Sequence, residues 1–433
     1  MTEATNPKYQ YELQYKRDFA DDKDHTLLFS AIGNLFSKDQ SSEFFDRTLS
    51  GADVGSDQRT ATSFSEERTT FKLDYTKPVN ESWTIETGAQ YMLNHVNNDF
   101  EVSDLVDNVW ETNEGLTNIF DYTQNVLAFY GTAAYEKNDW GIKAGLRAEN
   151  TELSTLLENT QQANNQNFTD LFPSLHSSYK FSDGFSIQTG YSRRIFRPRM
   201  WNLNPFFNIR NNFNIRQGNP DLLPEYTDSY ELTSIFITGN TSMNLGVFYR
   251  YTTDVVERIV TSQENVNTSQ PYNIGTNKAT GVEFNAKYTL SKKVTINADF
   301  NYNQFRREGA FDDFMIDFTG SQWTGKMSTK LKLPYGIDIE ATGRYNSSVA
   351  TVQGEVSDLA WMDMGLRKKI LNGRGILNIA VRDLFRSRIR ESVTDQTDFY
   401  AFSRGLRGRF ITAGFSYGFG KGEAMEFSGR RRR

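Results

Sequence analysis

The chain has no cysteine and only three histidines among its 433 residues. Without cysteine it forms neither disulfide bridges nor thiolate metal sites, and it has no cysteine nucleophile. The histidines, His25, His95 and His176, lie far apart and lack the paired spacing of a metal site. Nothing in the sequence pairs a serine or aspartate nucleophile with a base and an orienting group. We therefore expect no enzyme, no bound metal and no cofactor.

Long apolar runs are also absent. No run approaches the roughly 18–20 residues of a membrane-spanning helix, and the first residues lack the positive flank and apolar core of an export signal. The formal net charge is −6, and the basic residues cluster only at Arg430 to Arg433. We therefore expect no nucleic-acid partner, and we expect the basic tail to stay solvated.

What the chain does contain is a strict alternation of apolar and polar residues, clearest at 281–302. Apolar residues hold every second position on both sides of a turn at Ser291 and Lys292: Val282, Phe284, Ala286, Tyr288 and Leu290, then Val294, Ile296, Ala298, Phe300 and Tyr302. Side chains two apart share one face of a strand, so this pattern predicts strands with one apolar and one polar face. These strands are longer than the usual length of about 5–6 residues in globular proteins. They reach the roughly 9–11 residues that a tilted strand needs to cross a bilayer.

The alternatives to a membrane barrel are a soluble sandwich, a propeller or a β-solenoid, which also have regular strands. Propeller blades need strands of about 5–6 residues, and no blade-length repeat is visible. The aromatic content of 14% with few prolines suits strands that end at interfacial aromatic girdles. Charged residues such as Lys143, Arg147 and Glu149 alternate with apolar ones, and on a lipid face they would cost about 2–4 kcal/mol each. We therefore predict an all-β fold, an antiparallel transmembrane β-barrel whose charges face a wet lumen.

Period two and turn residues predict about seventeen strands. They are expected near 9–18, 26–36, 66–76, 81–94, 123–136, 139–154, 171–181, 184–195, 226–238, 241–256, 276–290, 293–306, 319–332, 336–348, 358–370, 374–388 and 403–419. Short turns are expected at 78–80, 138–139, 182–184, 239–240, 291–292, 334–336 and 372–373. Long connections are expected at 37–65, 95–122, 155–170, 196–225, 257–275, 307–318, 349–357 and 389–402.

The short and long connections alternate, as in bacterial outer-membrane barrels, which have short periplasmic turns and long outer loops. Such barrels normally have an even number of strands. The odd count and the missing export signal therefore predict that the amino-terminal part of the protein lies outside this chain.

Four stretches carry a resemblance to a known family. They are Ser192-Arg193-Arg194-Ile195 through Arg197-Pro198 to Leu203-Asn204-Pro205-Phe206; Gly218-Asn219-Pro220-Asp221-Leu222-Leu223-Pro224-Glu225 leading to Tyr230-Glu231-Leu232; Asn273-Ile274-Gly275 with Gly281-Val282-Glu283; and Asn378 through Asp383-Leu384-Phe385, then Phe415-Ser416-Tyr417-Gly418-Phe419-Gly420. Together they resemble the barrel of TonB-dependent outer-membrane receptors, in particular the outer-membrane β-barrel family common in Bacteroidetes.

This resemblance implies a barrel of about 22 strands, of which the chain would supply the sixth to the last. It also implies a missing plug domain and a missing TonB-engaging segment. The expected division is an amino-terminal lead-in at 1–8, where the truncation falls, a barrel at 9–420 and a basic periplasmic tail at 421–433. Residues 403–419 resemble the closing strand read by the barrel assembly machinery.

The function implied is active import of a nutrient such as a siderophore, an oligosaccharide or a peptide across the outer membrane of a Gram-negative bacterium. The alternative is a passive pore or an adhesin barrel without TonB coupling. Either protein would contact lipid and lipopolysaccharide, and the importer would also bind an extracellular nutrient ligand.

The expected outer loop 196–225 holds the candidate ligand residues. Its arginines can grip phosphates through their guanidinium groups, and its aromatic rings can stack on sugars or siderophores. The candidates are Arg197, Arg199, Trp201, Phe206, Phe207 and Phe213. A structural role in packing, with the loop folded on itself, is the alternative and is favoured for both groups of residues.

Overall fold

The computed structural model describes residues 2–19, 22–45, 57–206, 208–211, 214–263, 266–312, 314–397 and 399–419. Within them, 19 strands belong to one sheet, and two smaller sheets have four strands each. The chain divides into two compact units. Unit 1 comprises Met1–Ser177, Tyr191–Thr227 and Asp254–Asn273, and unit 2 comprises Ser178–Gly190, Asp228–Thr253 and Ile274–Arg433.

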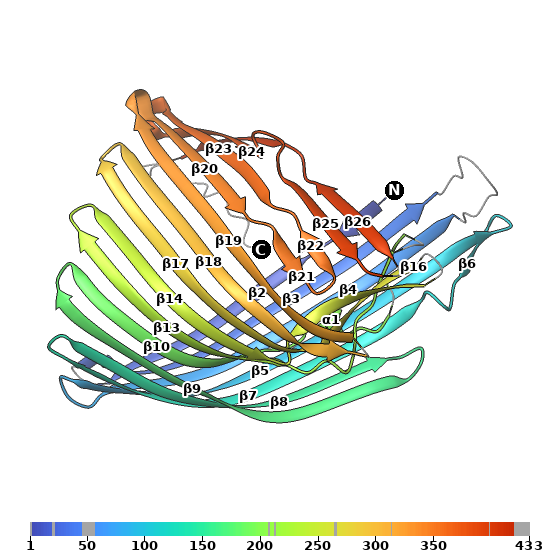
Figure 1. Ribbon diagram of the computed structural model, residues 1–433, viewed down its shortest axis with the longest axis horizontal. Coiled ribbons are helices and arrows are strands. Elements are labelled where there is room, and N and C mark those ends of the chain that lie inside the picture. Colours follow the sequence, from blue (N-terminus) through green and yellow to red (C-terminus); the bar gives the residue numbers. More distant parts are fainter. Residues whose placement is uncertain are drawn as a thin grey trace. The chain divides into compact units, whose positions relative to one another are not determined.

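Unit 1 is built on long antiparallel strands that pair with their neighbours in sequence order (Figure 1). They are β2 (Lys8–Phe19), β3 (Asp22–Phe44), β4 (Gln58–Pro78), β5 (Trp83–Val106), β7 (Asn118–Lys137) and β8 (Trp140–Leu157). The short strands β1 (Thr2–Thr5) and β6 (Val109–Thr112) extend the outer parts of β3 and β5. The expected lead-in at 1–8 is therefore mostly strand.

Unit 1 also contains a short helix and a small sheet. The helix is α1 (Met200–Leu203), and the sheet joins β11 (Asn208–Asn211), β12 (Asn214–Arg216), β15 (Val256–Gln263) and β16 (Val266–Asn273). Among the described residues, no helix is long and apolar enough to span a membrane. Three strands have residues in both units: β9 (Gln162–Ser182), β10 (Phe185–Phe196) and β13 (Glu225–Thr238).

Unit 2 continues with the same antiparallel pairing in sequence order (Figure 1). Its strands are β14 (Thr241–Thr253), β17 (Gly275–Ser291), β18 (Val294–Phe311), β19 (Phe314–Leu333), β20 (Ile337–Asn346), β23 (Leu359–Ile370), β24 (Gly375–Arg382) and β27 (Phe410–Tyr417). A second small sheet joins β21 (Val349–Thr351), β22 (Gly354–Val356), β25 (Ile389–Asp395) and β26 (Tyr400–Leu406). Two short 3₁₀ turns, η1 (Pro334–Gly336) and η2 (Leu371–Gly373), close hairpins.

Each of the seventeen expected strands overlaps a strand of the large sheet, and the short turns fall where the sequence places them. The left-handed backbone that tight reversals require is found at Asn138 (φ 56°), Gly239 (φ 51°) and Gly373 (φ 88°). Asparagine and glycine tolerate this conformation best, which is why these turns could be read from the sequence.

The expected long loops are wrong in part, because many of their residues continue the strands. The ladder between β3 and β4 runs to the pair Phe44 and Gln58, well inside the expected loop 37–65. Likewise β18 and β19 pair as far as Phe311 and Phe314. The alternation ends earlier than the hydrogen bonding, since a strand that leaves an apolar environment gains nothing from an apolar face.

The last two expected strands also need correction. The strand expected at 374–388 ends at Arg382, because Asp383 (φ 53°) and Arg386 (φ 57°) adopt left-handed backbone and turn the chain. The strand expected at 403–419 begins at Phe410, and residues 400–406 form β26 of the small sheet instead. The basic tail from 421 onward lies outside the described residues.

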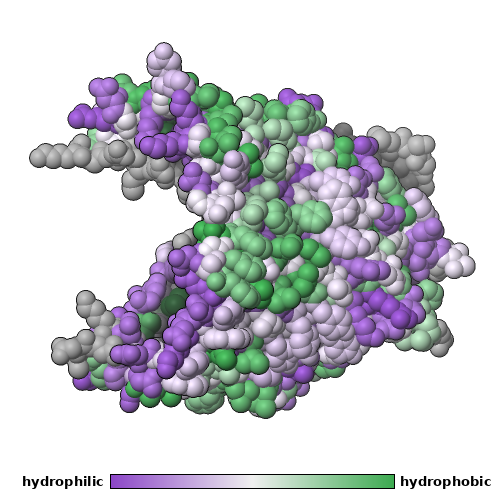
Figure 2. Space-filling view, turned by 60° about the vertical axis from the view of Figure 1, so that its left-hand side comes forward, coloured by the Kyte–Doolittle hydropathy of each residue, from purple (hydrophilic) through white to green (hydrophobic). Residues whose placement is uncertain are grey.

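Both units have one apolar and one polar sheet face, as the alternation predicts. In unit 1, the cross-strand row Phe71, Tyr91 and Leu127 is about two-fifths exposed, at 39%, 39% and 40%. Figure 2 shows apolar and polar residues gathered in separate zones of the face that it displays. On the opposite face of unit 1, Lys143 Nζ lies 2.6 Å from Glu86 Oε2. A face of exposed rings backed by a face of paired charges suits lipid on one side and water on the other.

Candidate functional site

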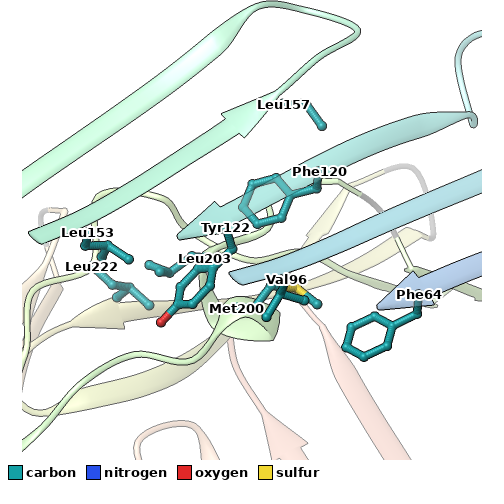
Figure 3. Close-up of a cluster of buried hydrophobic side chains, with 9 residues drawn as sticks. All are labelled: Phe64, Val96, Phe120, Tyr122, Leu153, Leu157, Met200, Leu203 and Leu222. Carbon is teal, nitrogen blue, oxygen red and sulfur yellow. The ribbon is translucent and has the colours of Figure 1, made fainter. Parts of the chain in front are cut away.

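Two described stretches of the segment after β10, residues 197–206 and 217–225, lie against the polar face of unit 1, and we call them together the inner strap. Its helix α1 and the turn at Leu222 bury apolar side chains against β4, β5, β7 and β8 (Figure 3). The buried cluster consists of Phe64, Val96, Phe120, Tyr122, Leu153, Leu157, Met200, Leu203 and Leu222. Leu203 and Leu222 are 0% exposed, so these two side chains are as fully buried as those in the core of a domain, and their burial holds the strap in place.

The strands prepare this anchor with apolar residues on their polar face. Tyr122 lies across from Val96 on β5, and Phe120 lies across from Leu157 on β8. These residues are in register with the charged side chains further along the same face, so they break the expected polar pattern. That break is the sequence signal of a covered patch.

An ion pair fixes the beginning of the strap. The Arg197 guanidinium places Nη2 2.5 Å from Glu149 Oε2 and donates through Nε to Thr151 Oγ1 at 3.0 Å. Glu149 is also paired with Arg147, its neighbour two positions along β8. The Glu149 side chain is only 9% exposed, so its charge depends on these two arginines.

Backbone contacts fix the end of the strap, and they explain its Gly-Asn-Pro motif. Gly218 N donates to Asn204 O at 2.8 Å, and Asn219 N donates to Asn202 O at 2.7 Å. A Cβ at Gly218 would lie 2.4 Å from Asn204 O, so only glycine allows this approach.

A single asparagine of β16 then clamps the strap to the neighbouring hairpin. Asn273 Nδ2 donates to Leu223 O at 3.1 Å and to Asp254 O at 2.7 Å, and its Oδ1 accepts from Leu223 N at 2.9 Å. Asn273 belongs to the motif Asn-Ile-Gly that carries the resemblance. Its role is thus structural and could not be read from its position in the sequence.

The structure places four of the six candidate ligand residues. Arg197 is paired with Glu149, Arg199 precedes α1 and is exposed, and Trp201 stacks on Phe64 with ring centroids 5.5 Å apart while remaining 55% exposed. Phe206 packs against the buried cluster. Phe207 and Phe213 lie outside the described residues. Ligand binding by these residues stays a prediction.

Two ionisable groups of unit 1, which also contains the inner strap, have shifted pKa values. The carboxyl of Glu158, in the turn after β8, shares a hydrogen bond with Asp121, and this like-charged neighbour raises the pKa of Glu158. Burial, followed by repulsion from Arg216, lowers the pKa of the Arg258 guanidinium in β15. Within the described part of the chain, no group of acidic and histidine side chains is arranged to hold a metal ion.

The polar face of unit 2 carries a ladder of paired charges. Lys326 Nζ lies 2.8 Å from Asp299 Oδ2, and Arg344 Nη1 lies 2.7 Å from Asp363 Oδ2. Glu283 accepts from Asn301 Nδ2 at 3.0 Å. A cavity of about 440 Å³ opens here, lined by residues that include Glu283, Asp299, Asn301, Lys326, Arg344 and Asn346.

A family model decides what this architecture is. Residues 17–417 match the outer membrane protein beta-barrel family. The chain belongs to this family. A comparison with curated proteins gave no match.

Solved structures of the same fold confirm the resemblance to TonB-dependent receptor barrels. The ferric yersiniabactin uptake receptor FyuA from Yersinia pestis is 14% identical with a TM-score of 0.62, and the match covers 95% of this chain and 61% of that one. The ferric-catecholate import receptor Fiu from E. coli K12 is 12% identical with a TM-score of 0.64, covering 95% and 64%. The copper transporter OprC is 11% identical with a TM-score of 0.67, covering 94% and 64%. The chain thus spans less than two thirds of these structures.

This outer-membrane β-barrel protein is integral to the outer membrane of a Gram-negative bacterium and belongs to a non-enzymatic class. Its apolar sheet faces therefore meet lipid, and its polar faces meet water. The link to Bacteroidetes stays a prediction.

A charge on the apolar face should weaken the barrel. Leu146 is 53% exposed on β8, near the middle of the alternating stretch, so Leu146→Lys is expected to destabilise the protein by about 2–4 kcal/mol in lipid. The measurement is urea unfolding of the vesicle-inserted protein. Gln90→Lys, on the polar face of β5, is the control and should change the unfolding free energy by less than about 1 kcal/mol. Equal losses in both variants would contradict the assignment of the faces.

Proposed function

We propose that this chain is the barrel portion of a TonB-dependent receptor that imports a nutrient actively. The observation that carries the proposal is the charged ladder on the polar face, with the pairs Lys326 with Asp299 and Arg344 with Asp363. A wall of paired charges and amides gives a hydrophilic solute a surface to move along, while leaving few isolated charges to trap it. Relatives of the same fold are described as an uptake receptor and an import receptor, which supports the same class of activity.

The inner strap favours a gated importer over an open pore. It occupies space above the polar face of unit 1 and is held there by Leu203, Leu222 and the ion pair of Arg197. A wide pore that passes solutes without selection has no need of such a segment, which narrows the path. A barrel that admits one ligand at a time gains a fixed surface on which that ligand can be selected.

The proposed ligand contacts are the exposed residues at the start of the strap. Arg199 supplies a guanidinium, and Trp201 supplies a ring held by its stacking on Phe64. The segments of the whole protein outside this chain would add the plug and the TonB-engaging segment. The other proposed partners are lipopolysaccharide and the barrel assembly machinery.

The test is uptake by the complete gene product. The gene would be expressed in a host that lacks its own receptors, with and without TonB, and supplied separately with radiolabelled ferric siderophores, oligosaccharides and peptides. We expect accumulation of one class only in the TonB-positive cells, abolished by a protonophore. Uptake that persists without TonB and after collapse of the proton gradient would instead establish a passive pore, and the importer proposal would fall.

A further inference from the structure

We propose that unit 2 contains an anion-binding site, formed by Arg344, Trp361 and Arg388 on its polar face. Arg344 of β20 and Trp361 of β23 are cross-strand neighbours, which places both side chains on the same face as Lys326. The Arg344 guanidinium carbon lies 5.7 Å from the centroid of the Trp361 ring, and the Arg388 guanidinium carbon lies 4.7 Å from it. Two positive groups thus converge on one indole.

Trp361 offers a hydrogen-bond donor with no acceptor. Its Nε1 is buried, and within the residues that the structure describes it has no hydrogen-bond partner. Buried indole N–H groups usually find a partner, and an unmet donor is costly. An oxyanion that displaces the side-chain atoms covering Nε1 would supply an acceptor and remove this cost.

Arg388 offers a guanidinium that no carboxylate neutralises directly. Among the described residues its side chain makes no ion pair, and its contact is the face of Trp361. Burial, together with the nearby Arg407 and Arg344, lowers the pKa of Arg388, while Asp363 and Asp383 act in the opposite direction. The surroundings therefore favour a further negative charge.

Both acidic neighbours already have partners. Asp383 is 2% exposed and accepts from the backbone N–H groups of Ser387, at 2.8 Å, and Arg388, at 3.2 Å. Asp363 accepts from Arg344 and from the backbone N–H of Asp383. These bonds hold the turn 383–388 in place, so Arg388 is presented by a fixed backbone.

The chemistry of the site selects a carboxylate or a phosphate. A guanidinium binds either oxyanion through two parallel hydrogen bonds, and the indole N–H adds a third donor. Arg344 also lines the cavity of about 440 Å³, together with Lys326, so there is room for a ligand beyond the bound oxyanion. The oxyanion could belong to a soluble nutrient or to the phosphate of lipopolysaccharide. This inference goes beyond import, because binding at equilibrium requires no transport.

The experiment is titration calorimetry of the complete gene product in detergent micelles free of lipopolysaccharide, with citrate and inorganic phosphate as separate probes. Arg388→Gln should weaken binding about tenfold, because it removes the positive charge and the two parallel N–H donors of the guanidinium. Trp361→Phe keeps a ring but loses the donor and should weaken binding about fivefold. The control Arg390→Gln removes an exposed charge two residues away and should stay within about twofold.

A repeat with purified lipopolysaccharide in the micelles distinguishes the two sources of the anion. Binding of citrate or phosphate that depends on Arg388 supports a soluble anion, and binding of lipopolysaccharide alone that depends on Arg388 supports a lipid phosphate. Circular dichroism and an unfolding curve verify that each variant is folded. If the folded Arg388→Gln variant binds every probe as the parent does, or if no probe binds the parent, the proposal is overturned.

Discussion

Replacing Leu203 with alanine is expected to release the inner strap from the polar face of unit 1. Leu203 is 0% exposed and is surrounded by the buried cluster, in which Met200 and Leu222 are its companions from the strap (Figure 3). Such a truncation loses the transfer free energy of the removed atoms and leaves a cavity, which together cost about 2–5 kcal/mol. Leu203 shares this anchoring with Met200 and Leu222, so we expect the substitution to lower mainly the free energy of local opening of the strap.

Hydrogen exchange read by mass spectrometry measures that opening. The amides of Gly218 and Asn219 donate to backbone carbonyls of the strap, so they should exchange faster by about 30-fold or more in Leu203→Ala. Trp201→Ala is the matched control, because Trp201 lies on the same helix but is 55% exposed. If both variants exchange alike, or if Leu203→Ala leaves these amides protected, burial of Leu203 is not what anchors the strap.

The regular part of this fold could be predicted from the sequence because one periodic pattern encodes it. Wherever a strand separates lipid from water, its side chains must alternate, as they do at Val282, Phe284 and Ala286. Short hairpins added a second signal, since Asn138 and Gly373 mark the positions that need a positive φ. The positions of seventeen strands of the large sheet and of the short turns between them followed from these two signals, whereas β1, β6 and the two small sheets did not.

The parts of the fold that could not be predicted lie where the strands no longer separate lipid from water, so that their side chains need not alternate. Beyond the apolar stretch the ladder of β3 with β4 continues through backbone pairing and polar side-chain contacts such as Arg59 with Glu43, and no apolar alternation marks it in the sequence. The strap was expected as an outer loop, because residues 196–225 form one of the long connections that alternate with short turns. Its observed position depends on Tyr122 and Phe120 of β7, a strand far away in the sequence. That these residues form an apolar patch for the strap can be seen only once the strand register is known.

The second large effect is expected at Arg197, where the sequence left two readings open, ligand binding and packing. The geometry supports packing, since the guanidinium is 18% exposed and faces a carboxylate, Glu149, that is 9% exposed. Arg197→Met would leave that carboxylate with Arg147 as its remaining partner. Removing one member of such a buried pair costs about 3–5 kcal/mol, because the other charge stays desolvated.

A double-mutant cycle separates the two readings. Urea unfolding of the complete protein would be measured for Arg197→Met, Glu149→Gln and the pair of substitutions together. If packing is the role, Glu149→Gln should recover more than about half of the free energy lost in Arg197→Met, since the buried charge is gone. Arg199→Met is the control and should cost less than about 0.5 kcal/mol, because Arg199 is exposed. If Arg197→Met unfolds like the parent but no longer takes up the nutrient, the arginine serves the ligand and its bond to Glu149 is incidental.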